Sequence, residues 1–323
     1  MTTVEEWLLD GPPWVEYRTR IELLGQKSNE TDIINVRKAI LAHPQVSDIL
    51  EELKLWDNSI LKRHNDANHL LHKLTFIADL GIQKEDNGIP QLIEQISLHK
   101  SKEGIYQTLV NIPERYGGTG EDQWAWMLCD APLLLYALTK LRYNDQRQMN
   151  KPLEVFIKFQ RDNGWPCAVA PELGKFRGPG RKADPCPYAN LLMLKVLSLY
   201  PQWRDSDFCK VGVETILTLW EQRKERRPYL FAMGSRFEKL KVPLIWYDIL
   251  HVTDVLSHFP WVNQDPRFLE MINIVRNKAD QHGRFKAESV WRAWKEWEFG
   301  QKKVPSRWVT LIVKCMLKRI EKT

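Results

Sequence analysis

The sequence repeats one short apolar ending: ALTKL at residues 137–141, VLSLY at 196–200 and VLSHF at 255–259. Related endings occur earlier and later in the chain. The last apolar residue of each ending recurs at intervals of 56 to 61 residues, at Leu24, Leu80, Leu141, Tyr200, Phe259 and Ile320. A fixed period of this length indicates a supersecondary unit that is copied and stacked, so that each copy covers an apolar face of the next.

Each repeat contains two predicted helices of different character. The first helix leads to the apolar ending and is apolar nearly all round, as in residues 183–200 and 241–259, which is typical of a helix buried on both sides. The second helix has one charged face and is expected at residues 89–99, 151–160, 207–222 and 266–279. Residues 14–56 resemble a degenerate first copy, and residues 305–322 supply only the first helix of the last copy. Alternation with a period of two, which would indicate strands, is nowhere sustained.

We therefore expect an all-α protein with a single domain spanning residues 1–323. Five or six helical hairpins of about 60 residues would form an α/α toroid, with an inner ring of apolar helices and an outer ring of amphipathic helices. An open superhelical solenoid is the alternative. The long connections that contain glycine, such as residues 110–123 and 168–183, would then lie on one face. Repeat proteins often place function on such a face, although the connections could also be tolerated surface insertions.

The composition is that of an ordinary water-soluble protein, with 43% hydrophobic and 27% charged residues. No apolar stretch is long enough to span a bilayer, and the N-terminus lacks the pattern of a secretory signal. Five cysteines without a close pairing pattern indicate reduced thiols, and we expect a cytoplasmic protein without a transmembrane segment. A net charge of +6 permits an anionic ligand but does not indicate nucleic-acid binding.

Polar and aromatic residues occur at matching positions in the early turns of the apolar helices. When the repeats are aligned on their endings, this layer includes His69, His72, Asp130, Tyr188, Tyr247, Asp248 and His251. Buried polar groups are costly unless they are paired, so their convergence predicts a cavity that opens toward the loop face. The alternative is a set of structural hydrogen bonds between neighbouring helices.

The chain has 14 tryptophans, which could be core or helix-contact residues. They could also line such a cavity, because a rigid aromatic wall suits a large apolar or cationic molecule. We expect Trp126, Trp246, His72 and Tyr188 to line it.

Asp130, Asp248 and Tyr247 are the predicted catalytic residues. Asp130 would be a buried acid with a raised pKa, or it would cap or bond a neighbouring helix.

Asp184 and Cys186 open one apolar helix, and His251 lies two turns into the next. Zinc accepts carboxylate, thiolate and imidazole ligands, and three protein ligands leave a fourth position open for chemistry. The alternative is structural. Asp184 would be an N-cap followed by Pro185 at the first helical position, Cys186 would fill apolar space, and His251 would bond to a neighbour such as Asp248. The two interpretations can coexist.

Three short motifs resemble known families. GRKADPC at residues 180–186 resembles the segment of protein prenyltransferase β subunits that leads from basic residues into the zinc-binding Asp-x-Cys. HVTDVLS at residues 251–257 resembles the segment that holds their zinc-binding histidine. QRDNGW at residues 160–165 is similar to a shortened Gln/Trp turn of squalene and other triterpene cyclases. These families share the α/α toroid, and the resemblance to the toroid superfamily covers most of the chain.

The resemblance implies that Asp184, Cys186 and His251 hold Zn²⁺, which would present a substrate thiol as a thiolate nucleophile. It also implies that basic residues lie near a diphosphate leaving group and that Tyr188 donates a hydrogen bond to it. These basic residues are Arg177, Arg181 and Lys182.

Two features depart from the families. Pro187 separates Cys186 from Tyr188, whereas the prenyltransferases have their aromatic residue directly after the cysteine. The Asp-x-Asp-Asp acid motif of class II cyclases is absent.

We therefore expect a prenyltransferase-like or terpene cyclase-like enzyme that binds an isoprenoid diphosphate in a central cavity, with zinc-assisted prenyl transfer as the specific reaction. The alternative is a non-catalytic helical repeat that binds a protein or peptide on its loop face. The set of Asp184, Cys186 and His251 favours the enzyme, because a scaffold does not require it.

Overall fold

The computed structural model describes residues 2–143, 146–176, 178 and 181–321. Thirteen α-helices make up most of the regular structure in these ranges, so the prediction of a mostly helical protein is confirmed. The chain divides into two compact units. Unit 1 comprises Met1–Ile49, Asp79–Ile82 and Met233–Thr323, and unit 2 comprises Leu50–Ala78 and Gln83–Ala232. The single domain predicted for residues 1–323 stays a prediction.

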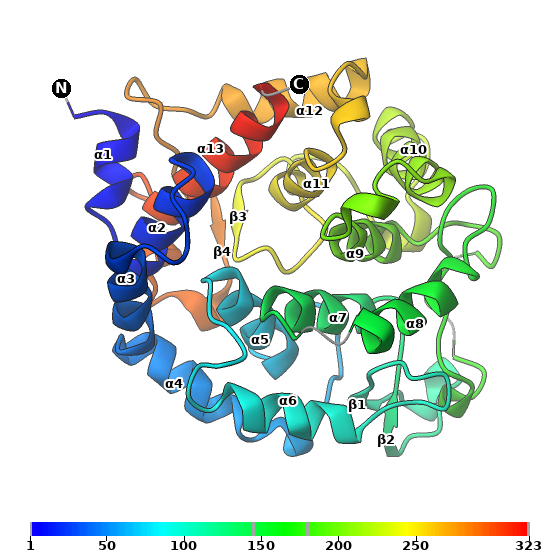
Figure 1. The fold of residues 1–323 in the computed structure, drawn as a ribbon. Helices are drawn as coiled ribbons and strands as arrows, with labels where there is room; N and C mark the ends of the chain where they lie inside the picture. The colour runs from blue at the N-terminus through cyan, green and yellow to red at the C-terminus, as the bar shows by residue number, and fades with distance from the viewer. Residues whose placement is uncertain (1, 144–145, 177, 179–180, 322–323) are drawn as a thin grey trace. The chain divides into compact units, whose positions relative to one another are not determined.

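Unit 2 is built from alternating helices of the two predicted kinds. The helices are α5 (Leu70–Asp79, whose last residue belongs to unit 1), α6 (Ile89–Leu98), α7 (Ala131–Lys140), α8 (Gln146–Ile157), α9 (Pro187–Leu197) and α10 (Asp207–Glu221). All of α9 is buried, as is α7 from its start to Leu138. Helix α9 packs against both α7 and α10 (Figure 1). Helices that are apolar all round are therefore buried between neighbours, as their sequence predicts.

Unit 1 contains both ends of the chain. Its helices are α1 (Val4–Leu9), α2 (Pro13–Arg18), the π-helix η1 (Thr19–Leu23), α3 (Thr31–Leu41), α11 (Ile249–Leu256), α12 (Pro266–Arg276) and α13 (Arg307–Glu321). Helix α4 (Pro44–Leu53) runs from unit 1 into unit 2. Helix α11 packs against α12 and α13, and α13 also contacts α1, α2 and η1 (Figure 1).

Side chains of α13 bind the backbone of the N-terminal segment. The Nε of Arg307 donates to the carbonyl of Trp7 at 2.9 Å. The Nζ of Lys318 donates to the carbonyls of Glu22 and Leu23 at 2.9 and 2.6 Å. These carbonyls are near helix ends, where backbone acceptors otherwise lack partners. Within unit 1, hydrogen bonds from Arg307 and Lys318 therefore attach the last helix, α13, to the N-terminal segment.

Short 3-10 helices follow several of the long helices. They are η2 (Trp56–Asn58), η3 (Glu114–Tyr116), η4 (Pro171–Leu173), η5 (Pro201–Trp203), η6 (Pro228–Leu230), η7 (Pro260–Val262), η8 (Arg292–Trp294) and η9 (Glu298–Gly300). Two of them, η5 and η7, begin with a proline directly after the repeated ending. Proline suits the first position of such a turn because its φ angle is already helical.

The sequence predicts the starts of the amphipathic helices better than those of the buried ones. Helices α6, α10 and α12 begin at the predicted residues, whereas α8 begins at Gln146 instead of residue 151. The buried helices α9 and α11 begin at Pro187 and Ile249, several residues after the predicted starts at 183 and 241. The prediction that Asp184 is an N-cap is wrong, because Cys186 is the N-cap and Pro187 is the first helical residue.

Two small sheets were not predicted. In unit 2, β1 (Thr108–Asn111) pairs antiparallel with β2 (Asp122–Ala125), with Thr108 opposite Ala125. In unit 1, β3 (Lys241–Val242) pairs parallel with β4 (Ser289–Val290). Strands of two to four residues are too short to show sustained alternation in a sequence. Within the described ranges, every helix lacks the combined length and apolar character that crossing a membrane would require.

Candidate functional site

The loop at residues 181–186, which leads into α9 in unit 2, is held by basic side chains from other segments. The Nη1 of Arg161 donates to the carbonyl of Lys182 at 2.6 Å. The Nη2 of Arg226 lies 3.0 Å from the Oδ1 of Asp184. Two guanidinium groups therefore fix the backbone and the carboxylate of a loop that carries further basic residues of its own.

The predicted basic residues of this loop are accessible. Arg181 and Lys182 are exposed, so their cationic groups can meet an anionic ligand. Arg177 lies outside the described residues.

Cys186 lies at the start of α9, where its sulfur takes part in two contacts. The backbone N–H of Ala189 donates to its Sγ at 3.5 Å, and the Sγ of Cys129 lies 3.7 Å away. Cys167 also forms a hydrogen bond with Cys129. Hydrogen bonds to Cys167 and to Cys186, together with burial, raise the pKa of Cys129 well above its ordinary value. We call Cys129, Cys167 and Cys186 the thiol cluster.

The Cys167 sulfur has a backbone partner of its own. The N–H of Gly178 donates to its Sγ at 3.3 Å.

A surface hollow of about 440 Å³ lies beside the same loop. Pro185 and Arg226 line one part of it, and α10 residues that include Thr215 and Leu219 line another. The Oγ1 of Thr215 donates to the carbonyl of Asn163 at 3.0 Å, which joins α10 to the turn at residues 161–164. The sequence did not predict this hollow, because its lining comes from segments that are distant from one another in the sequence.

Asp130 is fully buried directly before α7. Its Oδ1 accepts a hydrogen bond from the backbone N–H of Met127 at 2.8 Å, and its Oδ2 accepts one from the hydroxyl of Thr108 at 3.1 Å. Burial raises its pKa to about 7, although these hydrogen bonds act in the opposite direction. Asp130 is thus a buried acid with a raised pKa, as predicted. The alternative, a side chain that caps or bonds a neighbouring helix, is wrong, because its side chain makes no cap bond to α7 and its partner Thr108 lies in strand β1.

Two predicted lining residues of unit 2 are packed against other aromatic rings. Tyr188 is buried and its ring is stacked on that of Phe231, with centroids 6.4 Å apart. Trp126 is buried between Phe156 and Phe159, at centroid distances of 6.0 and 5.4 Å. Both side chains therefore take part in buried aromatic packing.

His72 is buried in α5 and forms a hydrogen bond to the backbone. Its Nε2 donates to the carbonyl of His64 at 2.7 Å, and burial lowers its pKa to about 3. His72 is therefore neutral at physiological pH. His64 and His69 lie before this helix, because α5 begins at Leu70.

In unit 1, His251 is fully buried and oriented by two hydrogen bonds. Its Nδ1 donates to the carbonyl of Trp246 at 2.8 Å, which fixes the orientation of the ring. Its backbone N–H donates to the Oδ1 of Asp248 at 3.1 Å. The predicted bond between His251 and Asp248 is confirmed, with the backbone rather than the imidazole as the donor.

The other predicted residues of unit 1 adjoin this histidine in the chain. Asp248 is buried and is the N-cap of α11. Tyr247 is buried, with its ring 5.5 Å from that of Phe237. Trp246 is half-buried and supplies the carbonyl that orients His251.

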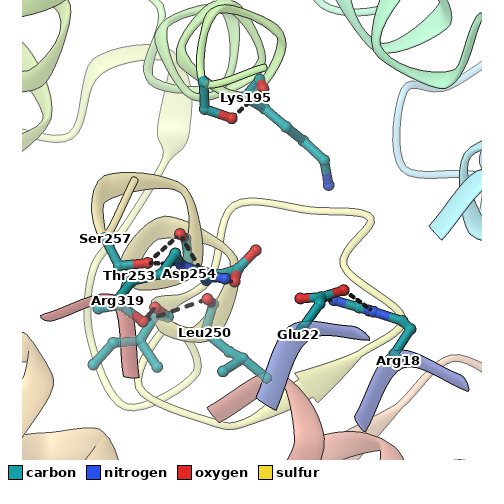
Figure 2. A network of polar contacts seen from close by, with 10 residues as sticks. Arg18, Glu22, Lys195, Leu250, Thr253, Asp254, Ser257 and Arg319 are labelled. Atoms are coloured by element: carbon teal, nitrogen blue, oxygen red, sulfur yellow. Dashed lines mark hydrogen bonds and ion pairs between the residues drawn. The ribbon is translucent and has the colours of Figure 1, made fainter. Parts of the chain in front are cut away.

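A second polar network in unit 1, centred on Arg319, was not predicted from the sequence. The guanidinium of Arg319 contacts the carboxylate of Asp254, and its Nε donates to the hydroxyl of Ser257 at 2.9 Å (Figure 2). Arg18 and Glu22 form another ion pair at 2.5 Å. One feature of the sequence could have indicated this ion pair. Asp254 and Arg319 have opposite charges and lie in apolar helices of two successive repeats.

The predicted zinc ligands fall in both units. Asp184 and Cys186 belong to unit 2 and His251 belongs to unit 1, so this zinc set stays a prediction. In the part of the chain that the structure describes, no three His, Cys, Asp or Glu side chains form a group arranged to hold a metal ion. Comparison with models of known protein families and with curated proteins finds no match to this chain.

Proposed function

We propose that this protein binds an isoprenoid diphosphate at the start of α9 and acts as a prenyltransferase-like transferase. The loop at residues 181–186 is the observation that carries the proposal. It combines exposed cationic groups, two guanidinium groups from other segments and the N-terminal end of a buried helix. Helix N-termini and arginines favour bound phosphate groups because they present N–H donors and positive charge.

The diphosphate would bind to Arg181, Lys182 and Arg226. The apolar chain of the ligand would lie along the aromatic side chains that include Tyr188 and Trp126. A guanidinium group that moves from Asp184 to the diphosphate would exchange one charge-assisted pair for another. This exchange keeps the cation paired before and after binding.

The ligand types of Asp184, Cys186 and His251 also suit zinc. Cys186 offers a sulfur ligand at a helix start, and zinc accepts sulfur ligands. His251 is held in the tautomer whose Nε2 can bind a metal, with its other nitrogen bonded to a carbonyl, as is typical of metal-binding histidines. Asp184 would use the carboxylate oxygen that Arg226 does not contact. When bound, zinc would lower the pKa of a substrate thiol.

Asp130, Asp248 and Tyr247 are the proposed catalytic residues. Asp130 is the strongest of them, because a carboxyl with a pKa of about 7 can hold or release a proton at neutral pH.

We further propose that the helical hairpins close into an α/α toroid. The buried helices α7 and α9 contact each other in unit 2, as do α11 and α13 in unit 1. The N-terminal helices contact α13, as closure of a ring requires. Small-angle X-ray scattering tests the proposal, because an open solenoid has a larger radius of gyration than a ring of the same length.

Ligand binding and metal content test the function separately. Farnesyl and geranylgeranyl diphosphate should each raise the melting temperature, whereas inorganic diphosphate should raise it less because it lacks the apolar chain. Protein purified under reducing conditions should contain stoichiometric zinc, which Cys186→Ser and His251→Ala should reduce and the matched control Cys209→Ser should not.

Each outcome has a defined meaning. No thermal shift with either prenyl diphosphate would refute the isoprenoid ligand. No zinc in the wild-type protein would refute the metal site and leave the isoprenoid proposal standing. Failure of both tests would favour the non-catalytic scaffold that binds a protein or peptide.

A further inference from the structure

The thiol cluster brings together three cysteines from three separate segments of unit 2. Cys129 precedes α7, Cys167 lies in the connection between α8 and α9, and Cys186 caps α9. Cys129 is the central member, because its Sγ lies 3.7 Å from that of Cys186 and is hydrogen-bonded to Cys167. Cys209 in α10 and Cys315 in α13 lie outside this cluster.

Exposure distinguishes the members of the cluster. Cys129 and Cys186 are buried, whereas Cys167 is half-buried. A small oxidant in solution therefore reaches Cys167 before it reaches the two buried sulfurs.

We infer that the thiol cluster is a redox modification site, in which a hydroperoxide oxidises Cys167 and the oxidation passes to a disulfide between Cys129 and Cys186. The hydroperoxide is the two-electron oxidant. The inference goes beyond the proposed function. The Cys186 sulfur cannot bind zinc and form a disulfide at the same time, so the disulfide would form in protein whose Cys186 holds no zinc.

Three balanced steps complete the transfer. The Cys167 sulfur attacks the hydroperoxide, the O–O bond breaks, and Cys167 sulfenic acid and an alcohol (or water, from hydrogen peroxide) form. The Cys129 sulfur then attacks the sulfenic sulfur, a Cys129–Cys167 bond forms, and water leaves with the thiol proton. Finally the Cys186 sulfur attacks the Cys129 sulfur, and Cys167 leaves as a thiolate that takes up the proton released by Cys186. Two thiols and one hydroperoxide thus give one disulfide, one alcohol and one water.

The geometry favours this direction of transfer. The N–H of Gly178 bonds to the Cys167 sulfur, which makes Cys167 a good leaving group in the last step. Closing the gap between Cys129 and Cys186 from 3.7 Å to the length of a disulfide, about 2.05 Å, requires rotation of the two side chains. The product disulfide would lie in the buried part of the cluster, protected from external reductants.

Mass spectrometry of the full chain tests the inference. The reduced protein is treated with an equimolar amount of hydrogen peroxide, alkylated, digested without reduction and analysed. A peptide pair linked through Cys129 and Cys186, with Cys167 alkylated, is the expected product. Cys167→Ser should slow formation of this pair by at least about tenfold, because oxidation would have to begin at a buried thiol.

Cys209→Ser is the matched control, because it removes a buried cysteine outside the cluster, and it should oxidise at the wild-type rate. Cys129→Ser should stop the transfer and leave Cys167 as sulfenic or sulfinic acid. The inference is overturned if wild-type Cys167 becomes sulfinic acid while Cys129 and Cys186 are alkylated. It is also overturned if Cys167→Ser forms the linked pair at the wild-type rate. The wild-type measurement decides the question even if a variant fails to fold.

Discussion

Asp130 should make the stability of the protein depend on pH in an unusual direction. Its folded-state pKa is about 7, whereas an aspartate in the unfolded chain has a pKa of about 3.9. Between these values the folded state holds a proton that the unfolded state has lost. The free energy of unfolding should therefore decrease as pH rises, and for this group alone the decrease between pH 5 and pH 8 is about 3 kcal/mol.

Asp130→Asn is the test of this reasoning. The amide has nearly the same shape and cannot ionise. Its Oδ1 can still accept from Met127, and its Nδ2 can donate to the hydroxyl of Thr108 in place of the bonds that Asp130 forms. In the variant, the free energy of unfolding should therefore not show this decrease between pH 5 and pH 8. The stability of the variant relative to the wild type should rise by about 3 kcal/mol from pH 5 to pH 8.

Urea unfolding followed by tryptophan fluorescence at pH 5 and pH 8 measures the difference. Asp265→Asn is the control, because a hydrogen bond from Arg267 chiefly lowers the pKa of Asp265. A carboxylate with a lowered pKa contributes stability above its unfolded pKa and loses it as pH falls through the folded value, so Asp265→Asn should lose stability at both pH values. Parallel pH profiles of wild type and Asp130→Asn would refute the assignment of a titrating group to Asp130.

Substitutions at three further positions test an ion pair, a glycine turn and a helix cap. Arg319→Met leaves the carboxylate of Asp254 without its guanidinium partner and should cost about 1–3 kcal/mol, measured by urea unfolding, with a value near zero contradicting the pair. Gly164→Ala should lower the melting temperature clearly, because φ is +100° and a Cβ would lie 2.5 Å from the Oδ1 of Asn190, and an unchanged melting temperature would disprove this contact. Ser206→Ala removes the N-cap of α10 and should cost about 1 kcal/mol in thermal unfolding, whereas Ser206→Asp should retain most of it.

The start of α9 shows where prediction from sequence stops. Asp184-Pro185 and Cys186-Pro187 are two possible helix starts in succession, and each offers a side-chain acceptor followed by proline. Local preference favours aspartate as the cap. The helix begins at the second start because the backbone N–H of Cys186 donates to the carbonyl of Trp165 at 2.8 Å and Asp184 pairs with Arg226. Both partners are distant in sequence.

The thiol cluster illustrates the same limit. Cys129 and Cys186 lie at similar positions in successive repeats, just before or at the start of a buried helix, and alignment of the repeats could have indicated their proximity. Cys167 lies in an irregular connection, so no periodicity relates it to the other two. Its contact with Cys129 depends on the path of that connection.

The sequence by itself determined the repeated helical pairs and which of their faces are apolar, because both follow from residue spacing over a few turns. The tertiary structure decided which polar groups meet, such as Cys129 with Cys186 and the imidazole of His251 with the carbonyl of Trp246. Hydrogen bonds act over about 3 Å and depend on direction. Small differences in how helices and loops pack therefore select the partners, and no local pattern in the sequence records them.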